Sequence, residues 1–271
     1  MASKKTVWEQ EYARLWKREK RFLEQNQTQR TPYLNRRLET VVPKTLQKTL
    51  ESAFEKAFST VLEKGTGLIE GVSGRRKRER EYLLRRYAAQ LQPDRRSLRA
   101  FSRAAAGAGR KNLLLSGVEG VGLGLVGVGL PDVVLFTGVL LKSLCELAVN
   151  YGYPWDGNEE RRFVLELIPT ALSCGEELRA GNAELNHFLQ EGEWTVPVPQ
   201  EELRRSASAA LSRNLLYMKF LQGIPVAGAV GGAWDAVVLK RVQRYAELKY
   251  RRRFLLDWKR KEGESWSTPN T

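Results

Sequence analysis

Apolar residues recur at helical spacing in every long segment of the chain. Residues 6–25 place aromatic and aliphatic side chains three or four positions apart, with lysines and arginines between them, and this period is typical of an amphipathic helix. Residues 42–61 repeat the pattern, and Gly65 and Gly67 are expected to end that helix. No segment alternates apolar and polar residues as a half-buried strand does. The pattern predicts an all-α protein with no sheet of three or more strands.

The helical period continues to residue 261 and indicates a single large multi-helix domain. A turn at Gln92-Pro93-Asp94 divides a basic stretch into two helices, because proline disfavours helical geometry in the residue before it. Later helices are expected up to Gly152, over 158–190, from 199 to about 222, and over 240–261. We expect residues 1–30 to form an N-terminal amphipathic helix, residues 31–262 the helical domain, and residues 263–271 a disordered tail.

Two apolar segments rich in glycine interrupt this pattern, and each leads into a helix. The first lies within residues 113–132 and the second within residues 223–235. Each contains a proline and is followed by an aspartate and Val-Val-Leu, which suggests an internal duplication. Gly122-Leu-Gly-Leu-Val-Gly fits a nucleotide-binding pattern, but no strand precedes it and no Lys-Ser/Thr follows it. We interpret the glycines as structural, allowing close approach of backbones; they are Gly120, Gly124, Gly127, Gly129, Gly228, Gly231 and Gly232.

Three acidic residues in these segments are the candidates for catalysis. Glu119, Asp132 and Asp235 could form a carboxylate-based hydrolytic or metal site. Metal sites usually add histidine or further carboxylates in register, and no such ExxH or DxD pattern is present. The favoured alternative is that Asp132 and Asp235 cap helix N-termini, within the first turn of their helices. With two cysteines and one histidine the chain is not expected to bind zinc, and no cofactor is expected.

The charge of the chain favours an anionic partner. Lys and Arg total 45 against 31 Asp and Glu, a net charge of +14, so nucleic acid and anionic lipid are the natural electrostatic partners. Nucleic acid is less favoured, because no zinc finger, RNA-binding sheet or aromatic stacking ladder accompanies the charge. The anion-binding candidates come from the two most basic stretches, residues 75–110 and 240–261: Arg75, Arg76, Lys77, Arg78, Arg251, Arg252 and Arg253.

Attachment to a membrane surface is expected to be peripheral. Neither apolar segment has the roughly 20 uncharged residues that a spanning helix needs. Reversing Arg251, Arg252 and Arg253 to glutamate is therefore expected to weaken vesicle binding without loss of helicity. The N-terminus lacks the apolar stretch of a secretory signal, and two isolated cysteines suit a reducing compartment, so we expect a cytoplasmic protein.

Several short motifs, in order, resemble those of a known family. They are Trp16-Lys17-Arg18, Val42-Pro43-Lys44, Glu119-Gly120, Pro131-Asp132, Glu146 to Gly152, Glu160-Arg161, Leu221 to Gly232, and Ala246 to Arg253. Over residues 8–256 the chain is similar to the EcsC protein family. The resemblance implies a bacterial protein with no established catalytic activity, and the best-known namesake of the family is encoded beside an ABC-type exporter. Gly129-Leu-Pro-Asp132 and Trp234-Asp235 depart from the usual pattern of the family, which puts any site at those positions in doubt.

Together these features predict a non-enzymatic helical accessory protein at the cytoplasmic face of the membrane. Its partner would be an anionic lipid surface or a membrane protein such as an ABC exporter. A soluble protein with a carboxylate site at Glu119, Asp132 and Asp235, and a nucleic-acid-binding protein, are the alternatives.

Overall fold

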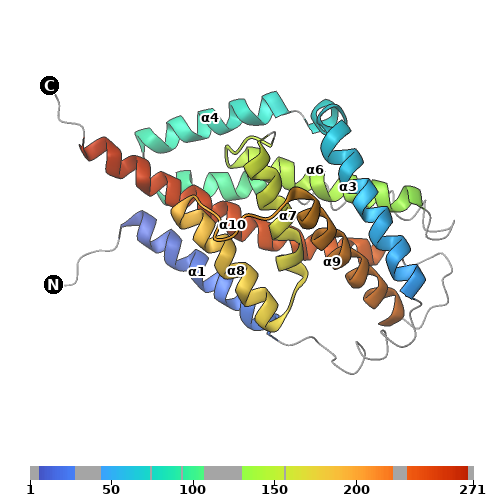
Figure 1. Ribbon diagram of the computed structural model, residues 1–271. Helices are drawn as coiled ribbons and strands as arrows, with labels where there is room; N and C mark the ends of the chain where they lie inside the picture. Colours follow the sequence, from blue (N-terminus) through green and yellow to red (C-terminus); the bar gives the residue numbers. More distant parts are fainter. Residues whose placement is uncertain are drawn as a thin grey trace.

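The protein is all-α: every regular element in the described residues is a helix (Figure 1). The computed structural model describes residues 6–27, 44–73, 75–92, 94–106, 130–155, 157–221 and 231–267. Within its helices it does not describe the side chains of residues 63–73, 75, 76, 130–132, 134, 135, 216–221, 231–235 and 262–267. These residues are the described part of the chain.

The first helix, α1 (Val7–Gln25), begins with a capping box. The Thr6 side chain accepts from the backbone N–H of Glu9, and the Glu9 carboxylate accepts from the backbone N–H of Thr6. Two backbone donors that the helix leaves unpaired are thereby satisfied. Leu15 and Phe22 mark the buried face, and the Trp8 indole donates a 2.7 Å hydrogen bond to the Leu255 carbonyl. This helix is therefore fixed to the far end of the sequence.

The next three helices are α3 (Lys44–Ser73), α4 (Arg75–Leu91) and an unlabelled helix over residues 95–106. The predicted turn is marked by a 2.8 Å hydrogen bond from the Asp94 backbone N–H to the Gln92 carbonyl. Asp94 ends it by accepting from the Ser97 backbone N–H at 2.7 Å, and the Ser97 hydroxyl lies 3.1 Å from the Asp94 backbone nitrogen. Helices α4 and 95–106 then pack against each other through an edge-on contact between Tyr82 and Phe101.

Helix α6 (Leu130–Asn150) ends at the predicted stop. Gly152 follows with a φ of +86°, and a Cβ there would overlap the Tyr82 ring. A glycine is needed at this turn both for its backbone conformation and for the close approach of α4. The chain continues through α7 (Asn158–Leu172), α8 (Gly175–Glu191), an extended connector, and α9 (Gln200–Leu221).

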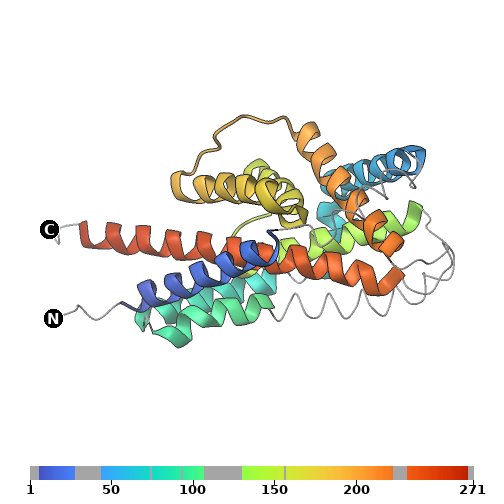
Figure 2. The same ribbon diagram turned by 90° about the horizontal axis from the view of Figure 1, so that it is seen from below.

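The last helix, α10 (Gly231–Ser267), has 37 residues and runs through the middle of the molecule. It packs against α1, α6, α7, α8 and α9. Figure 2 shows α1, α4 and helix 95–106 on one side of α10, and α8 on the other. Apolar side chains of this helix, including Val242 and Leu255, join those of α6 and α7 in a continuous core.

Some element boundaries differ from those expected. Helix α3 passes through Gly65 and Gly67 and ends at Ser73. A glycine inside a helix costs only about 1 kcal/mol relative to alanine. Each further residue of the helix still forms a backbone hydrogen bond, so the helix continues past both glycines. Helix α10 extends to Ser267, beyond the expected end at residue 261.

The described residues test only one part of the interpretation of the glycine-rich segments. Asp132 is the third residue of α6, in its first turn, as expected. Asp235 is the fifth residue of α10, past the first turn, so that expectation was wrong. Glu119 and the glycines at 120, 124, 127, 129 and 228 lie outside the described residues, and so does the body of the proposed duplication.

Candidate functional site

Five consecutive residues of α10, Lys249 to Arg253, form the polar centre of the molecule. Lys249 and Tyr250 are fully buried and Arg251 and Arg252 nearly so. Consecutive helical residues point about 100° apart, so such a run can be buried only where other elements surround the helix. Helix α10 meets this condition where it passes between α1 and the pair formed by α7 and α8.

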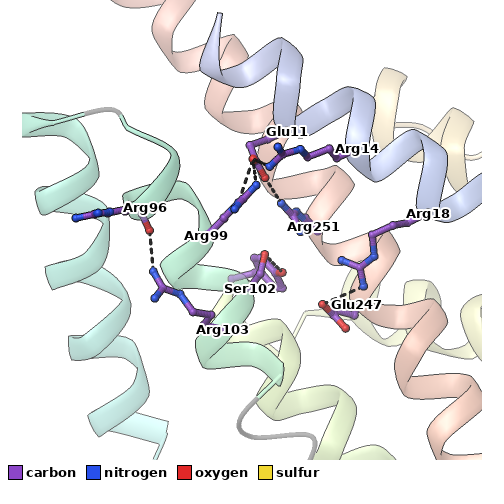
Figure 3. A network of polar contacts seen from close by, with 10 residues as sticks. Glu11, Arg14, Arg18, Arg96, Arg99, Ser102, Arg103, Glu247 and Arg251 are labelled. Atoms are coloured by element: carbon purple, nitrogen blue, oxygen red, sulfur yellow. Dashed lines mark hydrogen bonds and ion pairs between the residues drawn. The ribbon is translucent and has the colours of Figure 1, made fainter.

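Glu11 of α1 is the first of three carboxylates that compensate the positive charge of Lys249 and Arg251 to Arg253. It is completely buried, and one of its oxygens lies 2.5 Å from Arg251 Nη2. Its other oxygen accepts from Arg99 at 2.9 Å and from Arg14 at 3.0 Å (Figure 3). One carboxylate thus joins α1, α10 and helix 95–106.

Glu19, two turns further along α1, is the second carboxylate. Its oxygens lie 2.9 Å from Lys249 Nζ and 2.9 Å from Arg252 Nη2. Lys249 also donates to the side-chain oxygens of Asn182 and Asn186 on α8. Burial disfavours the charged carboxylate, but the two cations outweigh burial and lower the pKa of Glu19 to about 2. Burial lowers the pKa of Lys249 to about 8, and Glu19 only partly opposes that shift.

Glu160, at the start of α7, is the third carboxylate that compensates the positive charge of these α10 residues. The Tyr250 hydroxyl donates to it, and Arg253 Nη1 lies 2.6 Å from its second oxygen. The Arg253 guanidinium stacks 4.0 Å from the centre of the Tyr153 ring, a cation–π contact that strengthens away from water. Burial raises the pKa of Glu160, and Arg253 opposes the shift.

The placement of Arg251, Arg252 and Arg253 corrects the expectation that they form an exposed anion-binding surface. Their guanidinium groups point at buried carboxylates, so they join α10 to α1 and α7. Reversing all three to glutamate would set like charges together in the core and unfold the protein, so it does not test membrane binding.

The sequence did contain a signal for this core. Glu11 and Glu19 occupy the same helical face of α1 as Leu15 and Phe22. Carboxylates within an apolar stripe indicate buried partners, because an unpaired buried charge is very costly. The identity of those partners could not be read from the sequence, since Arg251 and Arg252 lie more than 230 positions away.

The other anion-binding candidates lie at the start of α4. Lys77 is exposed. Arg78 Nη2 lies 2.9 Å from the buried Glu146 carboxylate of α6, so this residue holds the two helices together. Arg75 and Arg76 belong to the helix, and their side chains are not described.

A cationic surface covers the α1 side of this core, and we call it the arginine face. Figure 3 shows Arg14 and Arg18 on α1, Arg99 between α1 and helix 95–106, and Arg96 and Arg103 on the side of helix 95–106 away from α1. Arg14, Arg18 and Arg99 are nearly half exposed, and each pairs with Glu11 or Glu247. Arg96 and Arg103 are exposed and are joined by a hydrogen bond from Arg103 to the Arg96 carbonyl. The arginine face consists of Arg14, Arg18, Arg96, Arg99 and Arg103.

The arginine face carries a surplus of positive charge. Glu11 also neutralises the buried Arg251, and Asp94 interacts electrostatically with Arg96, so three carboxylates serve six guanidiniums. Guanidinium groups bind phosphate and carboxylate oxygens through paired N–H donors. Chemically, the arrangement is suited to attract an anionic surface or an oxyanion.

The structure does not describe the side chains of Asp132 and Asp235, and Glu119 lies outside the described residues. Within the described part of the chain, no three His, Cys, Asp or Glu side chains are grouped closely enough to hold a metal ion. No helix there is long and apolar enough to cross a membrane.

Fold and site together define an all-helical protein whose core is cross-linked by buried ion pairs beneath a cationic face. The chain belongs to the EcsC protein family, whose model matches residues 9–255. It is similar to an uncharacterized protein, YdbA, of Bacillus subtilis (strain 168), with 26% identity over 156 residues. That match covers 56% of this chain and 57% of the relative's length. No solved structure matches the chain.

Proposed function

We propose that the protein is a non-enzymatic accessory protein that attaches reversibly to an anionic membrane surface at its cytoplasmic face. The observation that carries this proposal is the arginine face, where exposed guanidiniums outnumber their carboxylates on one side of the molecule. Each Lys or Arg close to an anionic leaflet contributes about 1 kcal/mol, within a Debye length of about 8–10 Å.

The distribution of acidic residues supports a single orientation on such a surface. Helices α7, α8 and α9 each begin with acidic residues in the first turn. Carboxylates at these positions stabilise the helix dipole. On α8, which has four glutamates and one arginine, they also leave a net negative charge on the side of α10 opposite α1. An anionic surface would therefore attract one side of the protein more than the other.

A membrane-protein partner is the second part of this proposal. Its basis is membership of the EcsC family, together with the expectation from the sequence resemblance that the namesake of this family is encoded beside an ABC-type exporter. Attachment to the bilayer would bring the protein to the membrane surface beside such a partner.

Vesicle co-sedimentation tests the attachment. We expect the protein to sediment with vesicles containing 30% phosphatidylglycerol in phosphatidylcholine and not with pure phosphatidylcholine. The double variant Arg96→Glu/Arg103→Glu should bind the anionic vesicles at least tenfold more weakly, because two attractive charges become repulsive. Neither residue is paired with Glu11, Glu19 or Glu160, so the fold should persist.

The matched control is Arg179→Glu/Arg213→Glu, which makes the same change in net charge at exposed positions of α8 and α9. It should retain most of the binding. Equal binding to neutral and anionic vesicles would contradict the proposal. Salt-sensitive binding to DNA or RNA without vesicle binding would assign the arginine face to nucleic acid instead.

A further inference from the structure

Helix α4 presents a row of large apolar side chains to water. Leu83, Leu84, Tyr87 and Leu91 are 58%, 70%, 63% and 69% exposed. The other exposed large apolar residues in the described part of the chain lie one to a helix or loop: Trp16, Leu46, Val196 and Val237. A contiguous exposed apolar row on a soluble protein usually marks an interaction surface.

The row lies on the face of α4 opposite its packing face. Tyr82 and Ala89 face the protein core, and Arg78 pairs with Glu146 of α6 on the same side. At 100° per residue, the exposed row points about 180° away from these residues. Figure 1 shows α4 along the upper edge of the molecule. The row is thus a convex ridge rather than the wall of a groove.

The charge around the ridge identifies the partner that fits it. Helix α4 contains seven basic residues and two glutamates. Lys77 and Arg80 are exposed beside the apolar row and Arg86 is partly exposed at its edge. A helix with an apolar face and a Lys/Arg-rich polar face is typical of helices that lie in the plane of an anionic bilayer. A second copy of α4 is a poorer partner, because it would set one basic helix against another.

We propose that α4 is an interfacial anchor that inserts Leu83, Leu84, Tyr87 and Leu91 into the headgroup region of an anionic bilayer. The inference rests on the proposed function, in which charge attaches the protein to the membrane. It adds α4 as a defined point of contact and the burial of apolar side chains as a second contribution to binding. Helix 95–106, which carries part of the arginine face, follows α4 directly through the turn at residues 92–94.

The first test compares leucines at two exposed sites. We expect Leu84→Ser/Leu91→Ser to weaken binding to vesicles with 30% phosphatidylglycerol by about tenfold or more, since two inserted side chains lose their apolar burial. Leu46→Ser is the control, because Leu46 is 44% exposed on α3 and lies away from the ridge. Circular dichroism should show the same helicity for all three proteins, as every changed side chain faces solvent.

A second measurement reports insertion directly. A solvatochromic dye attached at Leu84→Cys should shift to the blue when anionic vesicles are added. The same dye at Leu46→Cys should not shift, and labelling of the unchanged protein gives the background from Cys145 and Cys174, which are buried and partly buried.

The outcomes separate the two proposals. No binding of the unchanged protein to anionic vesicles would overturn the proposed function and this inference with it. Unchanged binding of Leu84→Ser/Leu91→Ser, with no dye shift, would overturn the anchor and leave electrostatic attachment standing. A dimer in sedimentation velocity that Leu84→Ser/Leu91→Ser dissociates would assign the ridge to self-association instead.

Discussion

Glu19 illustrates how single residues act in this protein. Its carboxylate is nearly buried between Lys249 and Arg252, and Asn186 donates a further 3.0 Å hydrogen bond to it. Removing water from three charged groups is costly, and their mutual attraction offsets much of that cost. The lowered pKa of Glu19 shows that attraction to its cationic partners outweighs burial, so the charged carboxylate is favoured. The lowered pKa of Lys249 shows that burial outweighs attraction there, so the charged amine is disfavoured. The network therefore specifies how helices meet more than it adds net stability.

Acid should destabilise the protein through Glu19. Its pKa is about 2 when folded and 4.5 ordinarily, so the unfolded chain binds the proton first as the pH falls. The contribution is complete above about pH 4.5 and is lost between pH 4.5 and 2, amounting to about 3 kcal/mol at 1.36 kcal/mol per pH unit. Urea unfolding at pH 5.5 and pH 3 should show about 2 kcal/mol of this loss, because the folded carboxylate is still mostly ionised at pH 3.

The Glu19→Gln variant provides the comparison for this prediction. It should already be destabilised by about 3–5 kcal/mol at pH 5.5, because Lys249 and Arg252 stay buried without a carboxylate. Its further loss in acid should be smaller than that of the unchanged protein. Glu24→Gln, at an exposed position of α1, should behave like the unchanged protein. A full acid loss in Glu19→Gln would assign the effect to other carboxylates.

Individual helices were largely predictable, because their apolar period is a local property of the sequence. Residues 6–25 became α1, and the stop at Gly152 followed from the glycine that the turn requires. The boundary at Gly65 was wrong, since a single glycine lowers helix stability without ending it. The burial of Arg251 could not be predicted, because it depends on Glu11 in another helix.

The crossing of α7 and α8 gives a prediction about packing. Gly181 of α8 lies so close to Thr170 of α7 that a Cβ would approach Thr170 Cγ2 to 2.9 Å. Gly181→Ala should therefore destabilise the protein by about 1–3 kcal/mol through overpacking. Thermal unfolding measures this, and Thr170→Ala should restore part of the loss.

A second glycine supplies the control for this crossing. Gly138 lies inside α6, and no described atom lies within 4 Å of the place that a Cβ would take there. Gly138→Ala should raise stability by up to about 1 kcal/mol, because alanine favours the helix. Equal effects of both substitutions would show that helix propensity, rather than contact, decides the outcome.

At the scale of the whole molecule, α1 closes the structure. It supplies Glu11 and Glu19, two of the three carboxylates that compensate Lys249 to Arg253. It also covers one side of α10 (Figure 2). We expected the N-terminal helix to be a unit beside the helical domain, whereas α1 packs into that domain. The amphipathic pattern of α1 was evident from the sequence.

Deletion of residues 1–27 should prevent cooperative folding. Lys249, Arg251 and Arg252 would lose their carboxylates, and breaking each buried pair costs about 3–5 kcal/mol, which together exceeds the usual stability of a domain. The truncated chain should show a broad thermal transition and rapid proteolysis. A synthetic peptide of residues 6–27 added in trans should restore protection, and a scrambled peptide should not. A sharp transition of the truncated chain alone would contradict this role.

The pairing of Glu11 with Arg251 has a consequence for how the protein is made. The two residues are 240 positions apart, so the first helix leaves the ribosome long before its partner is synthesised. At about 5–20 residues per second, that interval is on the order of 10–50 seconds. Throughout this interval the apolar face of α1, with Glu11 and Glu19, has no partner on α10. We therefore expect the nascent chain to expose this face to chaperones and proteases until its last helix emerges.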